Sequence, residues 1–182
     1  MSINHLLVDL GGPQNIGGLM RDLYELSGTD SKLFIYDPRD KLNTLYNDIL
    51  SASIGLLSEG RHEIVEDINS FLETYESRVI IADVSKDAIS LSEFHFEEND
   101  LILYGNENRG FYNEELLQVV DTKNVDHSII VPMQASPRVL PPTNKIVAPN
   151  YNIYPNLNVR TAATIIAYTA LKQLGYFKNF KL

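Results

Sequence analysis

Two short apolar segments limit what this chain can fold into. Val79–Val84 is apolar at every position except Asp83, and Leu101–Tyr104 is apolar throughout. Continuous apolar runs of this length are typical of parallel strands that are covered on both faces of a sheet. We therefore expect both segments to be central strands with helices packed on either side.

Strand-like and helix-like segments alternate along the rest of the chain. The further expected strands are Ile3–Asp9, Lys32–Tyr36 and His127–Val131. The expected helices are Asn15–Leu26 with Asn15 as its N-cap, Lys41–Leu57, Glu63–Tyr75, Asn113–Val119 and Asn158–Leu174. This order predicts an α/β fold in which a mainly parallel sheet is flanked by helices.

The length and composition predict one domain over residues 1–182. With 182 residues and 44% apolar content, the chain can bury one sizeable core. Gln134–Tyr154 holds four of the eight prolines and shows no periodic pattern, so we expect an irregular inserted loop there. Neither a long apolar run nor a basic leader followed by an apolar stretch is present, which predicts a cytoplasmic protein without a membrane segment.

The residue types exclude several kinds of chemistry. The chain has no cysteine, which excludes disulfides, thiolate catalysis and zinc–sulfur sites. The four histidines, His5, His62, His95 and His127, have no partner at metal-ligand spacing, so we expect no metal site.

The net charge of −9 argues against binding nucleic acid by bulk charge. Local clusters of cationic side chains could still bind nucleic acid. The cations in or near loops that could face one cleft are Arg21, Arg39, Arg61, Arg109, Arg138, Lys145 and Arg160. The acidic residues are concentrated elsewhere, in Glu59–Glu76 and Glu93–Asp100.

The segment Val8–Gly18, VDLGGPQNIGG, partly resembles the glycine-rich first motif of Rossmann-type methyltransferases. However, Pro13 and Gln14 stand where that turn needs a further glycine for close approach to a cofactor. A Rossmann methyltransferase acting on a small molecule therefore stays a weaker alternative. A P-loop is excluded, because no Gly-Lys-Ser/Thr follows.

Three segments together carry a more specific resemblance. They are Pro13–Arg21 (PQNIGGLMR), Gly105–Gly110 (GNENRG, with the pattern Gly-x-Glu-x-x-Gly) and Pro155–Ala170 (PNLNVRTAATIIAYTA). In this order they resemble the three motifs of the SPOUT superfamily of RNA methyltransferases, in its SpoU/TrmH-type ribose 2′-O-methylating branch. The ending LKQLGYF is similar to that of minimal tRNA 2′-O-methyltransferases.

The resemblance implies a fold, a cofactor and partners. It implies a C-terminal trefoil knot, S-adenosyl-L-methionine (AdoMet) as methyl donor, RNA and most specifically tRNA as substrate, and a homodimer. The reaction would transfer the methyl group to a ribose 2′-hydroxyl.

The resemblance also assigns residues. Arg21 would contact the ribose hydroxyl and help to deprotonate it, and both Asn15 and Arg21 would address one site at the start of a helix. The remaining residues implied around the reacting groups are Asn15, Glu107, Asn156 and Asn158. Those implied to hold AdoMet are Ala82, Gly105, Asn106, Gly110, Val131, Met133 and Leu157.

Two departures from the family pattern leave a second interpretation open. Asn156 stands where the family has a serine, and about twenty residues separate Met133 from Asn156 where the minimal enzymes have a handful. The alternative is therefore a degenerate paralogue that binds AdoMet or RNA without turnover.

Overall fold

The computed structural model describes residues 2–28, 30–84, 88–107, 111, 125–132 and 157–179. The expected helix Asn113–Val119 and the expected loop Gln134–Tyr154 lie outside these ranges. Within these ranges, no helix has both the length and the hydropathy needed to cross a membrane.

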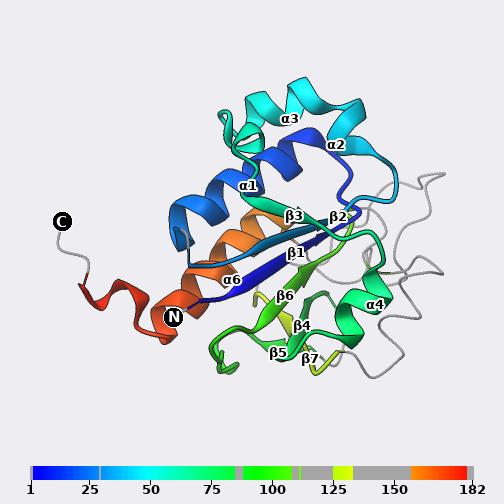
Figure 1. The fold of residues 1–182 in the computed structure, drawn as a ribbon. Helices are drawn as coiled ribbons and strands as arrows, with labels where there is room; N and C mark the ends of the chain where they lie inside the picture. Colours follow the sequence, from blue (N-terminus) through cyan, green and yellow to red (C-terminus); the bar gives the residue numbers. More distant parts are fainter. Residues whose placement is uncertain are drawn as a thin grey trace, which may run out of the picture.

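A seven-stranded sheet forms the centre of the fold (Figure 1). Its strands are β1 (Asn4–Val8), β2 (Leu33–Tyr36), β3 (His62–Ile64), β4 (Val79–Ala82), β5 (Ile89–Ser90), β6 (Leu101–Tyr104) and β7 (His127–Ile130). Their order is β3-β2-β1-β6-β4-β7-β5, and every pairing is parallel. The α/β class and the central positions of β4 and β6 are thus confirmed.

Helices cover both faces of this sheet. They are α1 (Pro13–Ser27), α2 (Lys41–Thr44), α3 (Tyr46–Ala52), α4 (Ile68–Glu73) and α6 (Val159–Gln173), with 3₁₀ helices η1 (Leu56–Glu59) and η2 (Tyr176–Asn179). One apolar core joins the sheet to α1, α3 and α6, and a second joins its other face to α4. Figure 1 shows α1 and α6 on one side of the strands and α4 on the other.

The predicted helix Glu63–Tyr75 was wrong in its first part. His62–Ile64 pairs with β2 as edge strand β3, and Ile64 is 53% exposed. The helix starts only at Ile68, because the side chain of Asp67 caps it by accepting a hydrogen bond from the Ser70 amide at 2.8 Å. The apolar residues at 64 and 65 had suggested helical periodicity, whereas they belong to a strand and the turn after it.

One further expected helix is divided, and one strand was not predicted. Lys41–Leu57 is divided into α2, α3 and η1, with Ile54 in the left-handed region at φ 49° between the last two. The short strand β5 was not predicted, since two residues carry too little pattern to be recognised.

Asn15 is not the N-cap of α1, contrary to expectation. Gly12 occupies that position in an extended conformation, and Pro13 follows as the first helical residue. Proline suits this position because its fixed φ matches the helix and its missing N–H would have no partner there. Asn15 therefore lies in the first turn, where its side chain is free to contact other elements.

Glycines let α1 approach its neighbours closely. A Cβ atom on Gly17 would lie 2.5 Å from the Ile49 carbonyl oxygen and 2.7 Å from the Ala52 Cβ of α3. A Cβ atom on Gly18 would lie 2.7 Å from Nε of Arg160, at the start of α6. Both contacts fix the position of α1, and with it the position of the residues in its first turn.

We expect Gly17→Ala to destabilise the protein. The added methyl group would meet α3 backbone that cannot move aside, which costs about 1–3 kcal/mol of unfolding free energy despite the better helix propensity of alanine. Urea denaturation measures this change. Gly12→Ala is the control, because nothing lies within 4 Å of its added Cβ. Equal stability of the two variants would contradict the close packing of α1 on α3.

Candidate functional site

The candidate site lies where β1 and β6 end. The two strands are neighbours in register, with Leu7 opposite Tyr104, so the residues after each strand come together at the carboxyl edge of the sheet. Ligands of open α/β sheets bind at this edge, where connections diverge to opposite sides. Here β1 leads through Asp9–Gly12 into α1, and β6 leads directly into Gly105–Glu107.

The Glu107 carboxylate binds two groups of the connection between β1 and α1. One oxygen, Oε2, accepts a hydrogen bond from the Gly11 amide at 2.6 Å. The other, Oε1, accepts a short hydrogen bond from Nδ2 of Asn15. Glu107 is half-buried, and bonds to a carboxylate are stronger than those between neutral groups. It therefore joins the second sequence motif to the first.

Asn158 extends this chain of hydrogen bonds to the third motif. Its Nδ2 donates to Oδ1 of Asn15 at 3.1 Å, while its own Oδ1 caps α6 by accepting from the Arg160 amide at 2.9 Å. Both ends of the Asn15 amide are thus engaged, by Glu107 and by Asn158. Glu107, Asn15 and Asn158, three of the residues implied by the resemblance, thus form one row of hydrogen-bonded side chains.

An ion pair holds α6 against α1 next to this row. The Arg160 guanidinium donates to both carboxylate oxygens of Asp22, at 2.7 and 2.8 Å, and Thr164 donates to the same carboxylate. The hydrogen bond from Arg160 holds the pKa of Asp22 below its ordinary value. The pair fixes the start of α6, from which Asn158 reaches Asn15.

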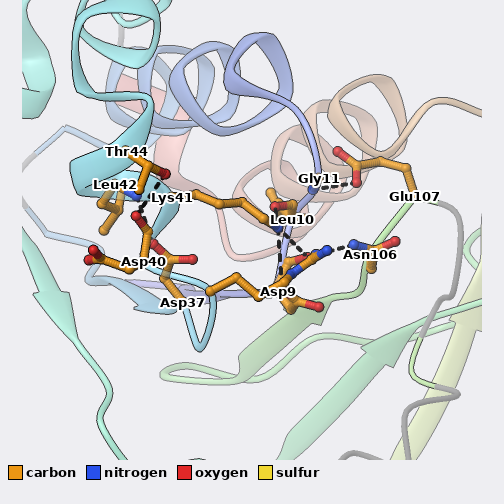
Figure 2. A network of polar contacts seen from close by, with 11 residues as sticks. Asp9, Leu10, Gly11, Asp37, Asp40, Lys41, Leu42, Thr44, Asn106 and Glu107 are labelled. Atoms are coloured by element: carbon orange, nitrogen blue, oxygen red, sulfur yellow. Dashed lines mark hydrogen bonds and ion pairs between the residues drawn. The ribbon is translucent and has the colours of Figure 1, made fainter.

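Asp9 is the centre of a second polar network at the same edge (Figure 2). It is 3% exposed and has a left-handed backbone at φ 50°. Its carboxylate binds Nε of Arg39 at 2.5 Å and Nζ of Lys41 at 3.2 Å. Its carbonyl oxygen accepts a hydrogen bond from Nδ2 of Asn106 at 2.6 Å. The network places Asn106 beside β1 and leaves Glu107 directed at Gly11.

Arg21 does not join these residues. It lies exposed on α1 and forms no hydrogen bond or ion pair with another residue of the described ranges. Six residues along a helix correspond to a rotation of about 600°, which turns Arg21 about 120° away from Asn15. The two side chains therefore address different directions within one chain.

Three of the arginines expected to face one cleft form ion pairs within the fold. Arg39 binds Asp9, Arg61 binds Glu59 at 2.8 Å, and Arg160 binds Asp22, so each is paired with a carboxylate. Arg109, Arg138 and Lys145 lie outside the described residues.

The residues implied to hold AdoMet partly adjoin one another. Ala82 ends β4 between Tyr104 of β6 and Ile129 of β7, and Gly105 and Val131 follow these neighbours closely. Ala82 and Val131 are partly buried and pack against the core, so a small and an apolar side chain lie near each other at the carboxyl edge of the sheet. Such a wall fits the flat face of an adenine, and the edge backbone can supply polar contacts.

Four other residues are implied by the resemblance to hold AdoMet. Leu157 directly precedes Asn158 and is half-buried, whereas Asn106 contacts Asp9 as described. Gly110 and Met133 lie outside the described residues, as does Asn156, which the resemblance assigned to the reacting groups.

Sequence reasoning missed two charged groups at this edge. Burial raises the pKa of Asp83, which follows Ala82 at the end of β4. The aspartate interrupting the otherwise apolar segment Val79–Val84 was the available signal. Lys41 had no such signal, because its burial depends on the contact with Asp9. Across the described ranges, no group of three or more His, Asp or Glu side chains could hold a metal ion.

A family model and several solved structures match most of this chain. The model of the SpoU rRNA Methylase family matches residues 2–140. A search of curated proteins gave no match. A solved structure concerned with 2-OH methylation of C/U34 on tRNA is 22% identical, with a TM-score of 0.69 over 96% of this chain and 97% of that one.

Two further solved structures share the fold. AviRb, a SpoU methyltransferase from Streptomyces viridochromogenes in complex with AdoMet, is 20% identical with a TM-score of 0.65. The match covers 95% of this chain, which spans 60% of AviRb. The A. aeolicus TrmH/SpoU tRNA modifying enzyme is 17% identical with a TM-score of 0.65, over 97% of this chain and 77% of that one.

The family match extends over more than two thirds of the chain and includes the first two motifs, which the structure joins through Glu107. Members of this family are RNA methylases. The chain belongs to the SpoU rRNA Methylase family.

Proposed function

We propose that this chain transfers the methyl group of AdoMet to a ribose 2′-hydroxyl of a tRNA, as a single domain over residues 1–182 in the cytoplasm. The observation that carries the proposal is the row Glu107–Asn15–Asn158, because it unites three motifs from distant parts of the sequence. The similarity in length and fold to the structure concerned with C/U34 on tRNA supports tRNA as the substrate.

AdoMet supplies an electrophilic methyl group on a positively charged sulfur. The protein's part is chiefly to align the ribose oxygen with that group, since holding reactants in line removes much of the barrier. Asn15 is suited to this part because both ends of its amide are fixed, one by Glu107 and one by Asn158. Ala82, Gly105, Asn106 and Val131 would hold the cofactor at the ends of β4, β6 and β7, together with Leu157.

Arg21 would contact the hydroxyl that is methylated. A guanidinium stays protonated in proteins, so it is a weak base and acts best by positioning the hydroxyl or together with an RNA phosphate. Its exposure and its lack of a described partner leave all of its donors available for RNA.

A homodimer would bring Arg21 of one chain toward the site of the other. The support is an apolar stripe on α6, where Ile165 is 39% exposed and Tyr168 is 48% exposed. The Phe177 ring stacks on Tyr168 with centroids 5.3 Å apart and extends this surface. Such a surface, together with the knot implied by the resemblance, suits close pairing with a second copy.

We expect Arg21→Ala to reduce methyl transfer to unmodified tRNA by about a hundredfold or more, because a group acting on the reacting hydroxyl is lost. Transfer of labelled methyl from AdoMet measures this, and calorimetry should show unchanged AdoMet binding. Arg61→Ala is the matched control, since Arg61 is also exposed and, among the described residues, is paired with Glu59 on the surface. Full transfer by Arg21→Ala would refute the role of Arg21.

We expect Glu107→Gln to impair transfer as well. The Gly11 amide and the Asn15 side chain both donate to Glu107, but a glutamine has only one oxygen that can accept. Its NH₂ group would face the other donor, and that hydrogen bond would be lost. Losing a charge-assisted bond costs about 1.5–3 kcal/mol, which should appear as slower transfer. Glu63→Gln, on an exposed side chain of β3, should leave transfer unchanged. A Glu107→Gln enzyme as fast as the parent would exclude Glu107 from the site.

We expect Tyr168→Glu to convert a dimer into a monomer in sedimentation experiments, because the new carboxylate would be buried in the apolar contact. Tyr46→Glu is the control, as Tyr46 is similarly exposed, at 42%, on α3. A dimer that survives Tyr168→Glu would place the contact elsewhere.

The alternative from the sequence, a paralogue without turnover, rests on Asn156 in place of a serine. The transfer assay separates the two. AdoMet binding without transfer to any RNA would favour the paralogue.

A further inference from the structure

Lys41 is a buried cation that the reaction does not use directly. It is 8% exposed and begins α2, whose turn is fixed by a hydrogen bond from the Leu42 amide to Oδ2 of Asp37 at 2.7 Å. Its chain reaches from α2 to the connection that follows β1 (Figure 2). An ammonium group is seldom buried to this extent unless it is paired, so its contacts call for an explanation.

The three N–H groups of Lys41 have three acceptors in that connection. They are Oδ1 of Asp9 at 3.2 Å, the Asp9 carbonyl oxygen at 3.3 Å, and the Leu10 carbonyl oxygen at a short distance. Burial lowers the pKa of Lys41, while the Asp9 carboxylate opposes this change. Two of the three acceptors are backbone atoms, so the ammonium holds the path of the chain as well as a charge.

The same connection is held from its other side by β6. Asn106 donates to the Asp9 carbonyl oxygen, and Glu107 accepts from the Gly11 amide. Asp9 is moreover in a left-handed conformation at φ 50°, which a non-glycine residue keeps only when its surroundings fix it. Gly11 and Asn15, which follow within six residues, thus take their positions from a segment clamped between Lys41 and β6.

We propose that Lys41 is a positioning residue for methyl transfer: its ammonium fixes Asp9–Gly11 so that the Gly11 amide and Asn15 meet Glu107. The expected effect on the rate of methyl transfer rests on the proposed function. Its structural consequence, the placement of the Gly11 amide, does not depend on that function.

The first test compares Lys41→Met with Lys32→Met, which alters an exposed lysine paired with Glu63 at 3.7 Å. Lys41→Met should lower kcat by about ten- to a hundredfold with the KM for RNA unchanged, because the reacting groups are misplaced while RNA contacts remain. The NMR signal of the Gly11 amide should move toward that of an amide exposed to water. Lys32→Met should change neither quantity.

A double variant separates positioning from stability. Lys41→Met leaves the buried Asp9 carboxylate with one partner fewer, and the melting temperature should fall. Adding Asp9→Asn removes the buried carboxylate charge and leaves Arg39, whose side chain is 40% exposed, to be solvated by water, so the melting temperature should largely recover. The kcat should remain low in the double variant, because the Leu10 carbonyl still lacks its ammonium donor.

Two results would overturn the inference. One is a kcat that returns together with the melting temperature in the double variant, which would make Lys41 purely structural. The other is a Gly11 amide signal unchanged by Lys41→Met. If the parent protein transfers no methyl group to any RNA, the proposed function fails, and the Gly11 signal alone then decides the role of Lys41.

Discussion

The site depends on one carboxylate. Glu107 binds the Gly11 amide and the Asn15 side chain at once, and so ties the end of β6 to the connection between β1 and α1. Charge-assisted bonds in a half-buried setting are strong enough to hold two loops in one arrangement. Without this carboxylate, the donors of Gly11 and Asn15 would have to find partners in water, and the row that ends at Asn158 would lose its fixed end.

The surrounding packing makes this arrangement rigid. Close contact at Gly17 sets α1 on α3, and the Arg160–Asp22 pair sets α6 on α1. Each of these contacts joins helices on the same face of the sheet, so the first turns of α1 and α6 have little freedom relative to each other. For a reaction that depends on aligning an oxygen with a methyl group, such rigidity is the main contribution a protein can make.

Most of the arginines discussed above are paired with carboxylates of the protein itself. Arg39, Arg61 and Arg160 neutralise carboxylates within the fold, which is consistent with an acidic protein that acts on RNA through few cations. Arg21 is exposed on α1 and has no such partner among the described residues. The charge that shapes the protein and the charge proposed to meet the substrate are thus carried by different arginines.

Periodicity alone determined the α/β class, the central strands β4 and β6 and the helices α1 and α6, while the resemblance of three motifs indicated the family. These are properties that the order of apolar residues and the glycine turns impose locally. The site residues Asn15, Glu107 and Asn158 could be identified by resemblance, but not their mutual contacts. Residues 15, 107 and 158 come together only because β1 and β6 are neighbours and α6 packs on α1.

Tertiary structure alone decided the rest. It made His62–Ile64 a strand, since a sheet edge was available to pair with it, and it moved the N-cap of α1 from Asn15 to Gly12. It also buried Lys41 against Asp9, and no local pattern marks a lysine for burial when its partner lies 32 residues away.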